Sequence, residues 1–213
     1  MKNNVKWLCR YTTLEYLLDL IIRKKMVLLD PIEHWEDKND TIVIEEYKMK
    51  SKIDNLYALC FTYGSETIHH WKYFSSGSNG CYIKFNAEQL IKILNKIDGV
   101  RHKKISYQKI NELKPKSFDL KQMPFIKRFP YKIEKEYRVI WEGKGNDKPI
   151  EIEIPLEIIE RITISGKMPS NVFETIKTLI ESKLDSRKIK IYRSTIYENK
   201  KWIGFFKKVR NET

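Results

Sequence analysis

Hydrophobic and polar residues alternate over the first segment of the chain, and a helical spacing of apolar residues follows it. Residues 5–11 alternate as expected for a strand. Leucines and isoleucines then recur every three or four positions over residues 14–22, directly after two threonines that can cap a helix. The apolar run at residues 26–29 is closed by Asp30 and Pro31. The pattern predicts a strand, a helix and a second strand.

The next part of the chain repeats this alternation around an aromatic segment. Residues 56–62 form an apolar run typical of a buried strand, and the aromatic residues at 69–74 follow a turn and predict a short helix. Residues 81–85 alternate as a strand. Asn86 is placed to cap an amphipathic helix that Gly99 closes.

The second half of the chain holds shorter strand-like segments. Strands are predicted near 104–107 and at 136–141, 149–154, 161–164 and 188–193, and a helix at 169–184. Because strands and helices interleave without a strict βαβ rhythm, the pattern favours an α+β fold. With 8 Gly, 7 Pro and no linker or internal repeat, the chain is predicted to form a single domain over residues 1–213.

Composition excludes several classes of protein. Hydrophobic residues make up 41% of the chain and aromatic residues 12%, too much for an intrinsically disordered protein. No stretch approaches the roughly 18 apolar residues of a membrane helix, so we expect a cytoplasmic protein with no membrane partner. Cys9, Cys60 and Cys81 form no CxxC pair, which excludes a disulfide framework and a cysteine zinc site. We expect them to be small buried hydrophobic residues.

Positive charge is concentrated in the second half of the chain. The net charge is +13, of which residues 1–50 contribute 0, residues 51–100 contribute +1, residues 101–150 contribute +8 and residues 151–213 contribute +4. Such an imbalance indicates attraction to phosphate polyanions. A lysine-rich, well-solvated surface without a polyanionic partner is the alternative.

The sharpest local feature is the segment Glu134-Lys135-Glu136-Tyr137-Arg138. On a strand, side chains two positions apart share a face, so Glu134, Glu136 and Arg138 are expected in one row. Two carboxylates this close ionise together only at a cost unless cations assist, which makes one of them a candidate acid, base or stabiliser of a cation. The alternative is an edge strand that carries ordinary surface charges.

A second feature is Arg10-Tyr11-Thr12 at the end of the first predicted strand. An arginine where a strand gives way to a helix is placed to donate two hydrogen bonds to a phosphate or carboxylate, and Thr12 adds a hydroxyl. A surface arginine without such a role is the alternative.

Two further groups of residues carry weaker signals. The histidines at 69 and 70 point to different sides of a helix and do not chelate one ion together, whereas Trp71 and Tyr73 are either core aromatics or a surface that stacks on a planar ring. Asp37 and Asp40 fit a Mg²⁺ site with the two glutamates, although they lie in what we expect to be a polar loop. No phosphate-binding glycine loop or GxSxG motif is present.

Taken in order, several of these segments resemble DUF2971, a bacterial domain family of unknown function. The resemblance covers nearly the whole chain. It departs from the family at Tyr131, where a tryptophan is common, and at Glu36-Asp37-Lys38, where Asn-Asp-Pro is common. The residues that carry it are Leu8-Cys9-Arg10-Tyr11-Thr12, Leu29-Asp30-Pro31, Trp35-Glu36-Asp37, Cys60-Phe61-Thr62, His70-Trp71-Lys72-Tyr73, Gly80-Cys81-Tyr82-Ile83-Lys84-Phe85 and Glu134-Lys135-Glu136-Tyr137-Arg138.

The layout is also similar to that of ADP-ribosyltransferases, which implies a split mixed β-sheet flanked by helices and NAD as substrate. By this resemblance Arg10 and Thr12 contact the NAD phosphates or ribose and Thr62 braces the site. Tyr73 or Trp71 flanks the nicotinamide. Glu136 is the catalytic residue, and Glu134 is the substrate-facing member of the pair. The match at Thr62 is loose, because a single threonine stands where the motif has Ser-Thr-Ser.

The leading hypothesis is an NAD-dependent ADP-ribosyltransferase-like enzyme, of the kind used as a toxin or phage-defence effector, that modifies nucleic acid or a nucleotide-bearing target. An antitoxin or other protein partner stays open. A noncatalytic nucleic-acid-binding protein of the same fold and a metal-dependent nuclease are the alternatives.

Overall fold

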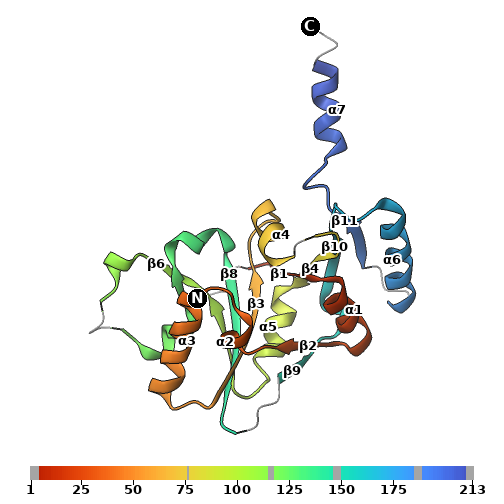
Figure 1. Cartoon of the computed structure of the whole chain (residues 1–213). Coiled ribbons are helices and arrows are strands. Elements are labelled where there is room, and N and C mark those ends of the chain that lie inside the picture. The colour runs from red at the N-terminus through yellow and green to blue at the C-terminus, as the bar shows by residue number, and fades with distance from the viewer. Residues whose placement is uncertain (1–4, 76, 115–117, 146–149, 185–188, 210–213) are drawn as a thin grey trace.

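A seven-stranded mixed sheet forms the centre of the molecule (Figure 1). The computed structural model describes residues 5–75, 77–114, 118–145, 150–184 and 189–209. The order across the sheet is β11-β10-β4-β1-β3-β8-β5, with antiparallel neighbours except for the parallel pair β10 and β11. Its strands are β1 (Trp7–Thr13), β3 (Asn55–Thr62), β4 (Gly80–Asn86), β5 (Val100–Lys104), β8 (Glu136–Gly143), β10 (Ile159–Ile164) and β11 (Lys190–Arg193).

Two small two-stranded sheets and several helices complete the fold. Strand β2 (Lys25–Leu28) pairs with β9 (Ile150–Glu153), and β6 (Ser106–Gln108) pairs with β7 (Ile126–Arg128). The α-helices are α1 (Leu14–Arg23), α2 (Pro31–His34), α3 (Lys38–Ser51), α4 (Ile68–Phe74), α5 (Ala87–Leu94), α6 (Ser170–Lys183) and α7 (Lys200–Val209). Short 3-10 helices are η1 (Ile110–Glu112), η3 (Leu120–Phe125), η4 (Phe129–Glu134) and η5 (Leu156–Ile158).

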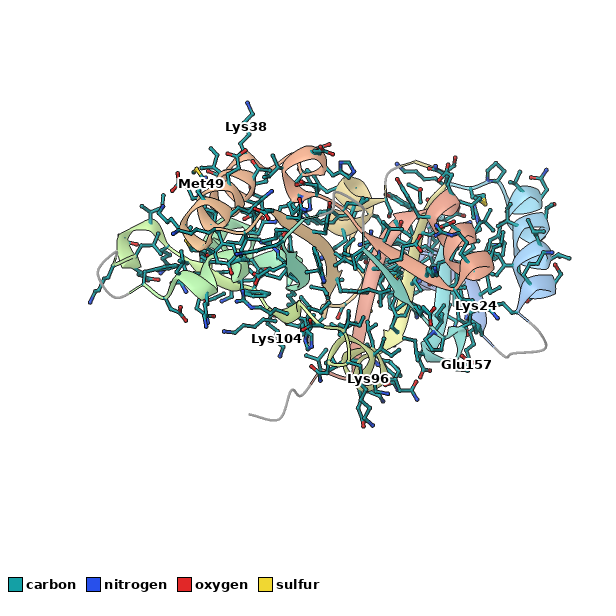
Figure 2. All side chains as sticks on the ribbon, turned by 90° about the horizontal axis from the view of Figure 1, so that it is seen from below. Lys24, Lys38, Met49, Lys96, Lys104 and Glu157 are labelled. Atoms are coloured by element: carbon teal, nitrogen blue, oxygen red, sulfur yellow. The ribbon has the colours of Figure 1, made fainter. Side chains whose placement is uncertain are left out.

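The alternation of side chains along the strands divides the core between the two faces of the sheet. Leu59 and Val139 belong to the larger hydrophobic cluster, to which α1, α5 and α6 contribute. Their neighbours Ala58 and Ile140 belong to a second cluster that packs under α3. Figure 2 accordingly shows Lys38 and Met49, which lie on α3, on the opposite side of the molecule from Lys96, which follows α5. Helices therefore cover both faces of the sheet.

The expected fold class, an α+β single domain with a mixed sheet flanked by helices, is confirmed. Most of the predicted strands and helices are present with shifted ends, but the segment 104–107 spans the end of β5 and most of β6 instead of forming one strand, and residues 149 and 188 of two predicted strands lie outside the described residues. The Asn86 side chain caps α5 by accepting from the Gln89 backbone N–H. Thr13 stands at the start of α1 without a side-chain capping bond. Within the described ranges, no helix is both long and apolar enough to cross a membrane.

The α-helices α2, α3 and α7 were not expected from the sequence, and one expectation about the chain before β8 is wrong. The polar loop predicted around Asp37 and Asp40 is instead the start of α3, with Asp37 as its N-cap. Helix α7 was not predicted. Glu134 does not lie on a strand, because β8 begins at Glu136 and Lys135 between them has a left-handed backbone, with φ of 45°.

Gly99 lies in the tight connection between α5 and β5. Its φ is +75°, and a Cβ atom there would lie 2.8 Å from the Glu142 carbonyl oxygen. Gly145 has a similar φ of +64° but open space around it. We therefore expect Gly99→Ala to lower the free energy of unfolding by more than the roughly 1 kcal/mol that left-handed strain costs Gly145→Ala. Urea unfolding of the two variants measures the difference, and equal losses would contradict the predicted clash.

Candidate active site

A cleft of about 840 Å³ opens where strands β1 and β3 diverge. These two antiparallel strands meet at one register pair, Cys9 with Thr62. Further along β3, Ala58 exchanges both of its backbone hydrogen bonds, 2.8 and 3.0 Å long, with Leu29 instead of with β1. The sheet is thus split between β1 and β3, as the resemblance to ADP-ribosyltransferases implies, and the cleft extends into the split.

Arg10 lies in this split. Cys9, Thr62 and Glu136 are register partners across β1, β3 and β8, so they share one face of the sheet, and Arg10 projects from the other. The strands separate beyond Cys9, and the Arg10 guanidinium reaches the edge of β3, where it donates a 3.0 Å hydrogen bond to the Cys60 carbonyl. The split therefore lets Arg10 and Glu136 line the same cleft.

The Arg10 guanidinium keeps donors for a ligand. The Arg10 side chain is half-buried, and burial lowers the pKa of its guanidinium. Arg10 forms no ion pair with any residue in the part of the chain that the structure describes. A guanidinium has five N–H groups, and the bond to Cys60 uses one of them. The remaining donors suit a phosphate or carboxylate that enters the cleft.

Glu136 is held by the guanidinium of Arg138. Arg138 Nε lies 2.6 Å from Glu136 Oε1, and Nη2 lies 2.9 Å from Oε2. Nη2 also donates to Asp40 on α3 at 2.9 Å, and Nη1 donates to the Pro124 carbonyl at 2.9 Å. The guanidinium stacks on the Trp35 ring, 4.4 Å from its centroid. Arg138 thus fixes the Glu136 carboxylate, and groups from three other segments of the chain hold Arg138 in place.

Lys127 is the second cation of this buried cluster. Its Nζ lies 2.8 Å from Glu134, 3.3 Å from Asp40 and 3.5 Å from Glu136. The ammonium group thus occupies the space between three carboxylates that a metal ion would need. The alternative of a Mg²⁺ site at Asp37, Asp40 and the two glutamates is not supported, because Asp40, Glu134 and Glu136 converge on side-chain cations and no group of metal-ligating side chains is found among the described residues.

The cluster gives its two glutamates different acid strengths. The two cations Arg138 and Lys127 outweigh the burial of Glu136 and lower its pKa to about 2. Burial raises the pKa of Glu134 despite the neighbouring Lys127. Three carboxylates face two cations, so the cluster has a net charge of −1 when all five groups are ionised. Glu136 is therefore ionised at neutral pH, and Glu134 is the one of the two nearer to accepting a proton.

Glu134 is held in place by two hydrogen bonds that its backbone carbonyl accepts. Thr62 Oγ1 donates to this carbonyl at 2.7 Å, and His70 Nε2 donates to it at 3.0 Å. Because a carbonyl only accepts, the proton of His70 lies on Nε2, and Nδ1 accepts from the Thr67 hydroxyl at 2.6 Å. Burial lowers the pKa of His70. His70 is therefore a neutral positioning residue.

The two aromatic candidates differ in their surroundings. Trp71 is 1% exposed, packs among Cys9, Tyr11 and Tyr82, and donates its indole N–H to Glu66 at 2.9 Å. Trp71 does not line the cleft, whereas Cys9 and Tyr11, against which it packs, do. Tyr73 is 72% exposed and lines the cleft. Of the pair, Tyr73 is the residue available to a planar ligand.

The structure brings most of the predicted site residues together and adds others. Arg10, Thr12, Thr62, Tyr73, Glu134 and Glu136 line the cleft, and Trp71 does not. Sequence reasoning did not find Lys127 and gave Arg138 and His70 no positioning role. The periodicity of Asp40, Ile44 and Tyr47, which all face inward from α3, was a signal for the helix that places Asp40.

No protein-family model and no curated protein sequence matches this chain, so its resemblance to DUF2971 stays a prediction. Among solved structures it is similar to DarT from Thermus sp. 2.9. DarT in complex with ADP-ribosylated ssDNA matches with a TM-score of 0.45 and 10% identity over 89% of this chain and 94% of that chain. DarT in complex with NAD+ matches with a TM-score of 0.43 and 8% identity, over 91% and 98% of the two chains. For the complex with carba-NAD+ the values are 0.44 and 11%, over 90% and 96%. Likeness at this level does not transfer an activity, so the function is inferred from the site.

The low pKa of Glu136 predicts how the cluster responds to acid. The pKa is about 2 in the folded protein against 4.5 for an unperturbed glutamate, so the stability from the ionised group is present above pH 4.5 and lost as the pH falls toward 2. Glu136→Gln lacks this contribution and leaves Arg138 with Asp40 as its remaining carboxylate partner, at a cost of about 3–5 kcal/mol near neutral pH. The difference in the free energy of unfolding between the two proteins should narrow on acidification.

Urea unfolding of wild type and Glu136→Gln at several pH values measures this difference. Glu174→Gln, at an exposed position on α6, controls for the substitution itself. If the difference in the free energy of unfolding between wild type and Glu136→Gln stays constant between about pH 7 and about pH 3, the cluster does not hold Glu136 ionised.

Proposed function

We propose that this protein is an NAD-dependent ADP-ribosyltransferase-like enzyme. The observation that carries the proposal is one cleft lined both by Arg10, which has no ion pair among the described residues, and by the fixed carboxylate of Glu136. The cleft volume of about 840 Å³ falls in the range of small-molecule and cofactor sites.

The charge distribution of the cleft matches that of NAD. The dinucleotide has a negative diphosphate and a positive nicotinamide ring. Arg10 supplies free N–H donors for the diphosphate, and Thr12 lies two residues further along β1. The cluster around Glu136, with its net negative charge, favours the cationic end. Tyr73 is exposed, lines the same cleft and offers a ring face for stacking on the nicotinamide.

Glu136 suits the bond cleavage that this reaction requires. The bond between C1′ of the ribose and the nicotinamide nitrogen breaks, and its electron pair leaves with neutral nicotinamide. Positive charge then develops on the ribose, where a fixed carboxylate that also accepts from the 2′-hydroxyl stabilises the transition state more than the ground state. Arg138 donates one hydrogen bond to each Glu136 oxygen and the Cys60 thiol donates a third, so of the roughly four lone-pair sites of the carboxylate one is left to accept from the 2′-hydroxyl.

Glu134 is the candidate base for the acceptor. Its raised pKa and its place in the cleft suit a group that takes the proton from the acceptor nucleophile as the new bond to C1′ forms. The hydrogen bonds from Thr62 and His70 to its carbonyl hold it at the edge of the cluster. The two glutamates thus take different roles because their surroundings move their pKa values apart.

A basic aromatic surface beside the cleft supports nucleic acid as the acceptor. Lys109 and Lys132 lie 5.4 and 5.3 Å from the centroid of the Phe129 ring, which is 40% exposed. Phe129 also lines a hollow of about 440 Å³ together with Lys109, Arg128 and Pro130, and Pro130 lines the cleft as well. Cations interleaved with an exposed ring suit the phosphates and bases of a single strand. An enzyme of this kind would serve as a toxin or phage-defence effector.

Substitutions at Glu136 and Arg10 should affect different steps of NAD turnover. Glu136→Gln should lower turnover about 10²–10³-fold, because it removes an electrostatic partner of the transition state. Arg10→Ala should instead weaken NAD binding, because its contact is made in the ground state and the transition state alike. Release of nicotinamide measures turnover, and isothermal titration with NAD measures binding.

Stability has to be separated from catalysis in this experiment. Glu136→Asp retains the charge that Arg138 needs but draws the carboxylate back, so it should fold well and still lose turnover. Arg23→Ala, at an arginine paired with Asp19 and Glu151, is the matched control for Arg10→Ala. Wild-type turnover in both Glu136 variants would refute the enzymatic proposal.

The nucleic-acid acceptor is tested by the salt dependence of binding. Lys109→Gln/Lys132→Gln should weaken binding of a single-stranded oligonucleotide and lower the slope of log K against log salt by about 1.4, or about 0.7 for each lysine. Lys92→Gln/Lys96→Gln, which removes two exposed lysines on and after α5, is the control. Fluorescence anisotropy gives the slopes. Oligonucleotide binding with modification absent would favour the noncatalytic alternative, and a slope that does not change would remove this surface from the interface.

A further inference from the structure

Helix α7 presents an uncovered apolar stripe at the end of the described chain. Figure 1 shows it standing away from the body of the molecule. Its apolar side chains are largely exposed: Trp202 68%, Phe205 61%, Phe206 51%, Val209 43% and Ile203 39%. The aromatic rings contact one another, with centroids 5.1 Å apart for Trp202 and Phe206 and 5.2 Å apart for Phe205 and Phe206.

The apolar stripe runs the length of α7, and the charged residues on the rest of the helix surface are all lysines. Trp202, Phe205, Phe206 and Val209 follow the i, i+3, i+4, i+7 spacing of one helix face. Four lysines lie on the remaining surface of α7, which contains no acidic residue: Lys200, Lys201, Lys207 and Lys208. Apolar and positive side chains are therefore separated onto different sides of the helix.

A helix as short and as exposed as α7 depends for its stability on packing of its apolar face against another surface. Isolated helices shorter than about 12–15 residues are marginal in water, and α7 has 10 residues. Its first turn is capped by Asn199, whose side chain accepts from the Trp202 backbone N–H at 3.0 Å. One such bond stabilises a helix by about 1 kcal/mol, which does not replace a packed face.

We propose that α7 binds the surface of an anionic lipid bilayer, with its aromatic stripe in the headgroup region and its lysines against the negatively charged headgroups. A strongly amphipathic helix with low net hydrophobicity, a basic polar face and Trp and Phe opposite is the form that lies in the plane of a bilayer interface. The 10 residues span about 15 Å, half the hydrocarbon thickness, so α7 lies on the membrane and does not cross it.

The charge pattern distinguishes a lipid surface from two other occupants. A second copy of this chain also has a net charge of +13, so docking α7 onto it brings like charges together. Single-stranded nucleic acid favours a surface on which cations and rings are interleaved, such as the one proposed around Phe129, whereas α7 separates its lysines from its rings. The proposal departs from the expected absence of a membrane partner, which considered only segments that span a bilayer.

Co-sedimentation of the full chain with vesicles tests the proposal. Binding is expected to vesicles of equal parts phosphatidylglycerol and phosphatidylcholine and not to pure phosphatidylcholine. Phe205→Ser/Phe206→Ser should weaken binding more than about tenfold, because it removes two rings from the inserted face. Both side chains are exposed, so the variant should fold. Met49→Ser, which changes a 66% exposed apolar residue on α3, is its control.

The charge contribution is tested by a second pair of variants. Lys207→Gln/Lys208→Gln should weaken binding roughly 30-fold, about a factor of five for each lysine near an anionic surface. Lys38→Gln/Lys96→Gln, at exposed lysines that Figure 2 shows on opposite sides of the body, should leave binding unchanged.

Three outcomes would overturn the proposal. They are equal binding to neutral and anionic vesicles, vesicle binding that survives the Phe205→Ser/Phe206→Ser change, and a dimer in gel filtration that this same change dissociates. None of these measurements uses NAD, so the result is independent of the proposed enzymatic function.

Discussion

The ion pair between Arg138 and Glu136 is the interaction on which the site depends. The guanidinium binds both oxygens of Glu136, Asp40 on α3 and the Pro124 carbonyl at the end of η3, and it stacks on Trp35. One side chain that is 1% exposed thus joins the sheet to the helices on this face. Removing either partner of this buried pair is costly because the other loses its bidentate partner and keeps one remaining ion pair, Arg138 with Asp40 or Glu136 with Lys127. The geometry of the carboxylate and the packing of α3 are therefore set by the same contacts.

The split between β1 and β3 is what makes this ion pair accessible to a ligand. In a continuous sheet, Arg10 and Glu136 would project from opposite faces, because Cys9 and not Arg10 shares the face of Glu136. Divergence of the strands after one register pair opens the cleft to both faces. The Arg10 bond to the Cys60 carbonyl then satisfies part of the exposed edge of β3. The divergence of β1 and β3 therefore accounts both for the missing backbone pairing between these strands and for the position of the Arg10 guanidinium.

Positive charge on this molecule is used in three separate settings. Lys127 and Arg138 are buried and compensate carboxylates, which leaves their cluster slightly negative. Lys109 and Lys132 surround an exposed ring beside the cleft. The lysines of α7 lie apart from its aromatic residues. The net charge of +13 therefore does not describe one surface, and the immediate partners of each cation decide what it attracts.

Local patterns were enough to predict much of this fold. The apolar run at β3, the alternation at β4, the helical spacing in α1 and α5 and the cap at Asn86 are all short-range features that can be read from neighbouring residues. The order of the segments carried the resemblance that places Arg10 and Glu136 in one site. Helix α3 was missed because most of its residues are polar, and its inward positions Asp40, Ile44 and Tyr47 are few.

Charge pairing across the fold could not be predicted from the sequence. Asp40 and Arg138 are 98 residues apart and Thr62 and Glu134 are 72 residues apart, and no spacing rule connects them. Whether Trp71 is core and Tyr73 is exposed depends on how α4 packs on β1, although both aromatics lie on the same short helix. The sequence by itself determined the elements and the candidate residues, since these follow from neighbours along the chain. The tertiary structure decided which carboxylate is fixed and ionised and where the sheet splits, since burial and long-range contacts set both.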